Sequence, residues 1–146
     1  MKKILYALAL SLAAAGCAEG LGPDLEPRVT IDSGPQLGLS TAEPEIVVTP
    51  VAGGFQVNGT LDAPDTCREL SGELSAFSPA DVMNLTLLVR VTPKGSGCGT
   101  AVGHFAYRAR VRPLPSGLYP LTVLHQIEQT GSPAPVAVFV GEIRIP

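Results

Sequence analysis

The sequence predicts an all-β protein, folded as an antiparallel sandwich of about seven strands. Apolar and polar residues alternate along seven short runs after residue 44. Gly, Pro, Asn or Asp stands at nearly every boundary between these runs, and no run has the apolar spacing of a capped helix. About 100 residues of this kind are enough to bury one core.

The composition supports short strands and excludes one class of partner. The chain has 146 residues, with 14 Pro, 16 Gly, 5% aromatic residues and no Trp, which suits strands joined by tight turns better than long helices. The formal net charge is −3. A mildly acidic protein lacks the basic footprint of nucleic-acid binding, so we expect no nucleic-acid partner.

The first 16 residues have the layout of an export signal. Residues 1–3 are Met-Lys-Lys, and residues 4–15 are apolar except for Ser11. This apolar run is shorter than the roughly 20 residues that a membrane-spanning helix needs, and small residues follow it. We therefore expect residues 1–16 to be a signal peptide that is removed.

The run Leu-Ala-Ala-Ala-Gly-Cys at residues 12–17 resembles the lipobox of bacterial lipoproteins. The resemblance implies that Cys17 is lipidated, with palmitate among its acyl chains, and becomes the new N-terminus. Several acyl chains give a stable anchor, whereas one anchors marginally. Ala18, in place of an Asp, favours the outer membrane over the inner one. The alternative is an ordinary signal-peptidase cut near residues 13–15, which would leave Cys17 as a free thiol.

Residues 17–44 are rich in Gly, Pro and Ser, and these residues interrupt every periodic run. We expect a flexible tether that spaces a domain at residues 45–146 from the bilayer. The alternation Val-Thr-Ile at residues 29–31 leaves one alternative open, an additional edge strand.

Each of the seven runs predicted as strands places one set of residues toward a core. In the last run, Ala137, Phe139, Gly141, Ile143 and Ile145 share the inward face. The aromatic residues fall mostly on inward sets, at positions 55, 105, 107, 119 and 139. The runs are Glu45–Thr49 (stopped by Pro50), Phe55–Leu61, Arg68–Phe77, Val82–Val91, Ala101–Val111, Leu118–Ile127 and Val136–Ile145.

The run L-P-S-G-L-Y-P-L-T-V at residues 114–123 resembles the L-x-x-G-x-Y-x-L-x-V run of many bacterial immunoglobulin-like modules. The resemblance implies an immunoglobulin-like sandwich in which Gly117 makes the turn into the penultimate strand. It also implies that the Tyr119 hydroxyl returns to nearby backbone. Together with Cys17, these features are similar to those of uncharacterised lipoproteins. Such modules host many functions, so the resemblance concerns the fold.

The chain has three cysteines, an odd number. In an exported protein we expect Cys67 and Cys98 to form a disulfide, which leaves Cys17 for the lipid. The bond would join the loops 63–66 and 94–99 at one end of the sandwich. On the chain-entropy model it would stabilise the fold by roughly 3–4 kcal/mol.

No group of residues predicts a catalytic, cofactor or metal site. His104 falls in an outward set and His125 in an inward set, so the two histidines of the chain cannot share an ion. No G-x-S-x-G elbow or phosphate-binding glycine loop is present. Asp62 and Asp65 flank Pro64, as is common in turns. We therefore expect a protein that is not an enzyme.

Arg108, Arg110 and Arg112 form an outward stripe on one predicted strand. We expect a solvated face on which these guanidinium groups pair with carboxylates, with Glu69 and Glu73 as candidate partners. The alternative is that the stripe binds an anionic partner such as surface polysaccharide.

These observations predict a non-enzymatic lipoprotein of the cell envelope, with its domain in the periplasm or at the cell surface. It would contact the membrane through its lipid and an envelope protein or polysaccharide through its domain. A different class of function is a protease inhibitor that presents the loops 63–66 and 94–99. A secreted enzyme is the third alternative.

Overall fold

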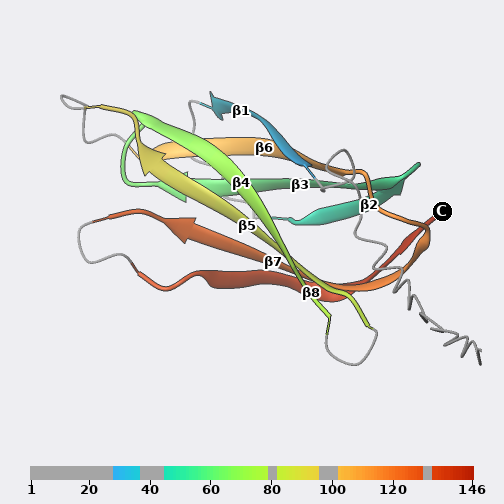
Figure 1. The fold of residues 1–146 in the computed structure, drawn as a ribbon. Helices are drawn as coiled ribbons and strands as arrows, with labels where there is room; N and C mark the ends of the chain where they lie inside the picture. Colours follow the sequence, from blue (N-terminus) through green and yellow to red (C-terminus); the bar gives the residue numbers. More distant parts are fainter. Residues whose placement is uncertain (1–27, 37–44, 79–81, 96–101, 130–132) are drawn as a thin grey trace, which may run out of the picture.

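The structure of the protein is a computed structural model, and it describes residues 28–36, 45–78, 82–95, 102–129 and 133–146. Within these residues eight strands form two four-stranded sheets packed face to face, and no helix is present (Figure 1). The predicted all-β architecture is confirmed, with one strand more than the seven expected. The strands are β1 (Arg28–Gln36), β2 (Val47–Val51), β3 (Gly54–Ala63), β4 (Arg68–Phe77), β5 (Asn84–Pro93), β6 (Gly103–Arg112), β7 (Gly117–Ile127) and β8 (Val136–Ile145).

The first sheet has the order β1-β6-β3-β2 and the second has the order β4-β5-β7-β8. All neighbours are antiparallel except β5 and β7, which run parallel. The expectation of purely antiparallel sheets is therefore wrong for the second sheet. The chain leaves β5, crosses to the first sheet and returns along β6, so β7 starts at the same end of the sandwich as β5 and runs in the same direction.

Strand β1 corrects the tether predicted for residues 17–44. Residues 28–36 pair with β6 along their whole length. Val29 and Ile31 turn inward and pack against the core. Their side chains occupy the space that a Cβ atom at Gly72 on β4 would need. The edge strand, which the sequence left as the alternative, is thus present because the core supplies an apolar surface for two side chains. Residues 17–27 and 37–44 lie outside the described residues.

The sequence predicted a strand that Pro50 stops. In the structure, β2 includes Pro50 and continues to Val51. Proline has no backbone N–H to donate to a neighbouring strand, so edge strands are among the few places in a sheet that tolerate it. β2 pairs only with β3 and forms the edge of the first sheet, where a proline is tolerated. The turn into β3 places Gly53 at a φ of 68°, in the left-handed region that favours glycine.

Alternate residues of β3, β5, β6 and β7 fill the core, as the sequence predicted. Each large apolar side chain buried in this way contributes about 1.5–3 kcal/mol relative to full exposure. Phe139 is half-buried and packs on the core from β8. The predicted inward side chains that the structure buries include Phe55, Val57, Leu61, Leu85, Leu87, Val89, Val91, Phe105, Tyr107, Ala109, Val111, Tyr119, Leu121 and Val123.

A β-bulge in β8 changes the inward set predicted for that strand. Val123 lies opposite Phe139, whereas the next residue, Leu124, lies opposite Ala137, so one extra residue is inserted on β8. Val138 and Phe139 both pack against the core as a result. Ala137 is exposed rather than inward, because one extra residue reverses the alternation before it.

The connection from β6 to β7 has the local structure that the sequence predicted. Gly117 begins β7, and the hydroxyl of Tyr119 donates a hydrogen bond of 2.8 Å to the carbonyl oxygen of Pro115. Leu114 is buried, and its N–H donates to the carbonyl oxygen of Gly53 at 2.9 Å. These bonds tie the ends of the two sheets together at one end of the sandwich.

We expect Gly72→Val to destabilise the protein by about 1–3 kcal/mol, as overpacking in cores does. A Cβ atom at Gly72 would lie 2.6 Å from Val29 Cγ1 and 2.7 Å from Ile31 Cδ1. Valine is otherwise a better strand residue than glycine, so the opposite sign would be expected where space is free. Urea unfolding of the variant measures the difference.

The matched control is Ser71→Val, one position earlier on the exposed face of β4. We expect this variant to unfold within about 0.5 kcal/mol of the unmodified protein. Equal stabilities of the two variants would show that β1 does not pack closely over Gly72.

Candidate functional site

The outer face of the first sheet carries the most closely grouped polar side chains. Inward packing of Tyr107, Ala109 and Val111 on β6 turns the residues between them outward, since successive side chains of a strand alternate. The predicted outward stripe of arginines is confirmed. The face, here called the outer polar face, consists of Arg28, Thr30 and Asp32 from β1, His104, Arg108, Arg110 and Arg112 from β6, and Gln56, Asn58, Thr60 and Asp62 from β3.

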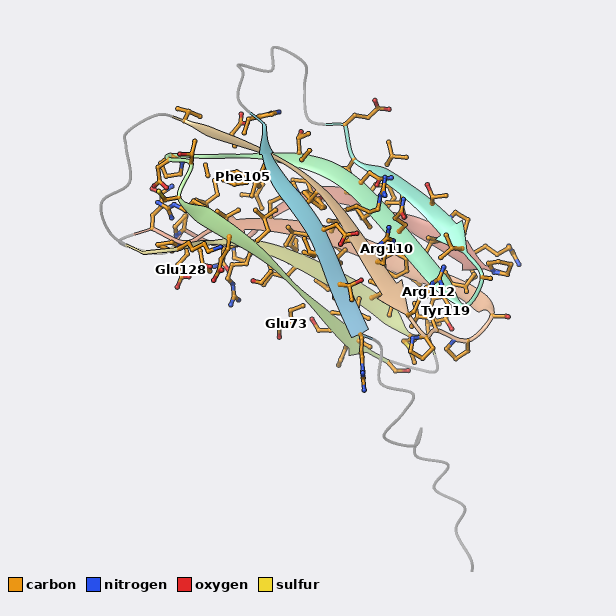
Figure 2. The ribbon with its side chains drawn as sticks, turned by 90° about the horizontal axis from the view of Figure 1, so that it is seen from above. Glu73, Phe105, Arg110, Arg112, Tyr119 and Glu128 are labelled. Atoms are coloured by element: carbon orange, nitrogen blue, oxygen red, sulfur yellow. The ribbon has the colours of Figure 1, made fainter. Side chains whose placement is uncertain are left out.

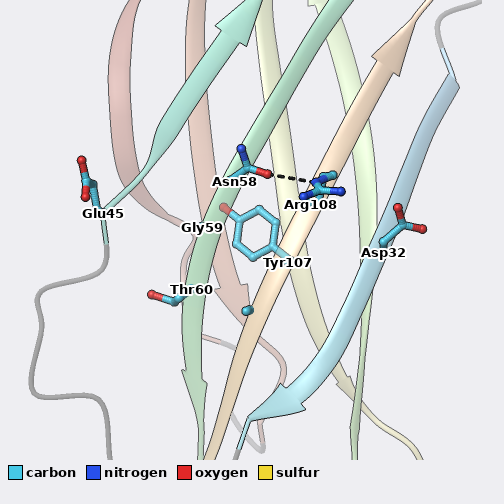
Figure 3. A pocket seen from close by; sticks show the side chains of 8 residues that line it. Asp32, Glu45, Asn58, Gly59, Thr60, Tyr107 and Arg108 are labelled. Atoms are coloured by element: carbon cyan, nitrogen blue, oxygen red, sulfur yellow. Dashed lines mark hydrogen bonds between the residues drawn. The ribbon is translucent and has the colours of Figure 1, made fainter.

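A shallow hollow of about 580 Å³ lies on this face (Figure 3). Its lining includes the carboxylates of Asp32 and Glu45 and the polar side chains of Asn58, Thr60 and Arg108. The Nε of Arg108 donates to the Oδ1 of Asn58 at 3.3 Å. The hollow therefore offers hydrogen-bond donors and acceptors to a polar ligand from the solvent.

The sequence predicted that the arginine stripe pairs with Glu69 and Glu73, and this prediction is wrong. Those two residues belong to β4, in the other sheet, and β1 lies between β4 and β6 (Figure 2). Strand β1, which lies in the segment predicted as a tether, provides the carboxylate instead. Asp32 of β1 accepts a hydrogen bond of 2.7 Å from Nη1 of Arg110.

The two histidines lie on different sides of the first sheet, as their alternation predicted. His104 is on the outer polar face, where its Nδ1 contacts the Oδ1 of Asp62 on β3. No hydroxyl group within the described residues is hydrogen-bonded to that imidazole, so the pair lacks the nucleophile of a catalytic triad. His125 lies inside the sandwich.

A buried polar pair crosses the core beneath the hollow. The hydroxyl of Tyr107, from the first sheet, forms a hydrogen bond of 2.7 Å with Nε2 of His125, from the second sheet. The two rings meet edge to face, with centroids 5.5 Å apart. Burial lowers the pKa of His125 to about 4, and it raises the pKa of the Tyr107 hydroxyl above its usual range. His125 is therefore neutral at pH 7.

Gly59 makes room for this pair. A Cβ atom at Gly59 would lie 2.6 Å from the Tyr107 hydroxyl oxygen. The sequence predicted that Tyr107 and His125 point inward but gave no sign that they meet. Their contact depends on how the two sheets are placed against each other, which alternation along a strand does not specify.

A second polar cluster lies at the start of β4. Asp65 Oδ2 accepts hydrogen bonds from Nε and Nη2 of Arg68, at 3.0 and 2.7 Å, and Asp65 Oδ1 accepts from the N–H of Cys67 at 3.0 Å. The hydrogen bonds from Arg68 hold the pKa of Asp65 below its usual range. Nη1 of Arg68 also donates to the carbonyl oxygen of Glu128 at 2.8 Å, which ties this turn to the end of β7.

The predicted role of Asp65 as a turn residue is confirmed by its bond to Cys67. The sequence missed Arg68 as the centre of the cluster and Glu128 as its distant partner, because the bond to Glu128 spans 60 positions of the chain. An open hollow of about 600 Å³ adjoins this cluster and is lined by Pro64, Arg68, Thr92, Pro93, Glu128 and Gln129.

The structure places one of the three predicted cysteine sites. Cys67 is half-buried just before β4, and its carbonyl oxygen accepts a hydrogen bond of 3.0 Å from the N–H of Lys94. Cys17 and Cys98 lie outside the described residues, so the lipid on Cys17 and the Cys67–Cys98 disulfide stay predictions.

Within the described ranges, no three His, Cys, Asp or Glu side chains are grouped so that they could hold a metal ion. The same part of the chain has no helix that is long and apolar enough to span a membrane.

We expect stability to fall by about 2 kcal/mol when the pH is lowered from about 7.5 to about 5. The pKa of His125 is about 4 in the folded protein, against an ordinary value of 6.5. Between these values the unfolded chain binds a proton that the folded protein does not, so acid favours unfolding. Urea unfolding at a series of pH values measures this slope.

Two variants assign the slope to one histidine. Tyr107→Phe combined with His125→Leu replaces the polar pair by apolar side chains and should remove the slope. His104→Gln changes the other histidine of the chain and should leave the slope in place. A slope that disappears in His104→Gln would place the titration on the outer polar face instead of in the core.

Comparison with known proteins finds no protein-family model, curated protein or solved structure that matches this chain. The function of the clusters described above therefore has to be argued from their own chemistry and from the sequence.

Proposed function

We propose that this protein is a non-enzymatic lipoprotein of the cell envelope, in which acyl chains on Cys17 hold a β-sandwich at the membrane. The observation that carries the proposal is a leader with two lysines at residues 2 and 3 and an apolar run after them, which ends in Leu-Ala-Ala-Ala-Gly-Cys at residues 12–17. The position of β1 adds support. β1 begins at Arg28, 11 positions after Cys17, with ten residues between them. A fully extended chain of this length reaches at most about 40 Å, which keeps the sandwich close to its anchor.

The sandwich is of the immunoglobulin-like kind in this proposal. Its support is local: the hydroxyl of Tyr119 returns to the backbone at Pro115, and Gly117 starts the penultimate strand. The parallel pairing of β5 with β7 departs from the fully antiparallel arrangement. The local likeness at residues 114–123 is thus stronger than the likeness of the whole topology.

A binding or structural role fits the described side chains better than a catalytic one. Three of the groups that could act as acid or base are engaged in contacts with neighbouring side chains. His125 bonds to Tyr107 in the core, Asp65 bonds to Arg68, and His104 contacts Asp62. The hollow on the outer polar face is shallow and polar, as suits an extended polar partner such as an envelope protein or polysaccharide.

The Cys67–Cys98 disulfide is part of this proposal. The bond between the N–H of Lys94 and the carbonyl oxygen of Cys67 brings the chain four positions before Cys98 next to Cys67. Only residues 95–97 lie between Lys94 and Cys98 in the sequence, so the pairing of Cys98 with Cys67 needs no large movement of either strand.

We expect Cys17→Ala to release the protein from membranes into the soluble envelope fraction, because the lipid is its anchor. Fractionation of cells that express the full chain, followed by immunoblotting, measures the distribution. The control is Cys67→Ser combined with Cys98→Ser, which should stay in the membrane fraction. That control should also unfold more easily, by roughly 3–4 kcal/mol.

A Cys17→Ala protein that stays with membranes and resists detergent-free extraction would contradict lipid anchoring. The same result would be expected if residues 1–16 stayed attached. The mass of the mature N-terminus separates the two cases, because the uncleaved leader adds the mass of 16 residues and no acyl chains.

A second candidate function is protease inhibition by the end of the sandwich that carries residues 63–66 and 94–99. It is favoured by the bonds of Asp65 and Arg68, which hold the first of these loops against Glu128 and reduce the entropy lost on binding. Inhibitory loops of this kind are rigid before they meet the protease.

We expect this candidate to show inhibition of at least one protease in a panel at micromolar concentration of the protein. Asp65→Ala should weaken the inhibition, because it frees the loop, while Asp62→Ala on the outer polar face should not. Absence of inhibition across serine, cysteine and metalloproteases would eliminate the candidate.

A further inference from the structure

Three arginines meet at one corner of the outer polar face. Arg28 lies directly opposite Arg112 in the pairing of β1 with β6, and Thr30 lies opposite Arg110. We call Arg28, Thr30, Arg110 and Arg112 the basic corner. Arg110 and Arg112 can be followed along β6 in Figure 2. Like charges at directly opposite positions of an antiparallel pair are unfavourable, so the corner is built against the electrostatic preference of the sheet.

The carboxylates of the outer polar face leave most of this charge unbalanced. Asp32 accepts a hydrogen bond from Arg110. Within the described residues, neither Arg28 nor Arg112 has a hydrogen bond or ion pair with another side chain. Both are exposed. Two guanidinium groups are therefore free to bind an anion from outside.

The space between these side chains suits a phosphate group. A hollow of about 330 Å³ is lined by the four residues of the basic corner. Guanidinium groups present forked pairs of N–H donors that match the oxygens of a phosphate, and the Thr30 hydroxyl adds a donor or acceptor beside them.

The corner lies where the N-terminal segment joins the sandwich. Arg28 is the first residue of β1, and Arg112 is the last residue of β6. The same end of the sandwich carries the end of β4 and the start of β5 (Figure 1), and the apolar side chains of Phe77 and Val82 are 71% and 49% exposed. Exposed apolar side chains at the same end of a domain as arginines can enter the head-group region of a bilayer.

We propose that the basic corner docks the sandwich against the phosphate groups of anionic phospholipids. This inference rests on the proposed lipid on Cys17, which would hold Arg28 within about 40 Å of the bilayer. Electrostatic attraction decays over about 8 Å at physiological ionic strength, which is much shorter than the reach of the segment between Cys17 and Arg28. A lipid anchor alone therefore does not fix how the domain faces the membrane. Contact of the corner with head groups supplies that orientation.

The size of the effect follows from the charge. Each arginine near an anionic bilayer surface strengthens binding about fivefold. Arg28 and Arg112 together would therefore favour the docked orientation about 25-fold. The N-terminal segment opposes this attraction, because residues 18–27 contain Glu19, Asp24 and Glu26 and no Lys or Arg.

The test uses the whole mature chain with Cys17→Ser, which removes the lipid and isolates the contribution of the corner. Cosedimentation is measured with vesicles of phosphatidylcholine alone and of phosphatidylcholine mixed with phosphatidylglycerol. We expect binding to the mixed vesicles only, weakening as salt is raised. Arg28→Gln combined with Arg112→Gln should lower the binding constant about 25-fold.

Two further variants make the comparison specific. Arg90→Gln combined with Lys94→Gln removes the same charge toward the opposite end of the sandwich and should leave vesicle binding unchanged. Arg28→Lys combined with Arg112→Lys keeps the charge and should retain most of the binding. Urea unfolding midpoints show that each variant is folded.

Three results would overturn the proposal. The first is binding to the mixed vesicles that Arg28→Gln with Arg112→Gln does not weaken. The second is no preference of the unmodified corner for phosphatidylglycerol. The third is binding that occurs only after Asp24→Asn and Glu26→Gln, because the native partner of the corner would then be its own N-terminal segment. Anchoring through Cys17 is measured separately by cell fractionation, so failure of the lipid-free assay leaves the proposed function standing.

Discussion

Alternation along β6 is the constraint from which most of the molecule follows. This strand pairs with β1 on one side and β3 on the other, so it is one of the two inner strands of the first sheet. Its inward residues Phe105, Tyr107, Ala109 and Val111 are buried and fix its orientation, since a slip by one residue would expose all of them. The same constraint turns the arginines between them outward. The core and the cationic surface are therefore two consequences of one register.

The sequence was sufficient for the features that depend on neighbouring residues. Alternation predicted the inward sets of β3, β5, β6 and β7, and the run at residues 114–123 predicted the bond of Tyr119. It was not sufficient for features that depend on how distant segments meet. The parallel pairing of β5 with β7, the partner of His125 and the partner of Arg110 all depend on which strand lies beside which, and a two-residue period carries no such information.

Strand β1 shows most clearly why the remainder could not be predicted. Val29 and Ile31 contribute apolar contacts among the side chains described at residues 28–32, and Gly34 and Pro35 are residue types that strands usually avoid. Its local preference for a strand is weak. The strand forms because β6 presents a row of unpaired backbone groups and Gly72 leaves space on β4 for the two side chains. The same strand supplies Asp32 and Arg28. Because the strand was not predicted, the contribution of these two residues to the outer polar face was not predicted either.

The antiparallel pairing of β1 with β6 has a mechanical consequence. If the protein is held by its N-terminus, a pull on the anchor enters the domain through Arg28, and one component of the force acts along the axis of β1. A force in that direction shears the strand against its neighbour, so the ladder that joins residues 28–36 to residues 104–112 shares the load instead of opening one bond at a time. The first strand would thus serve as the attachment through which the domain withstands tension from the moving envelope.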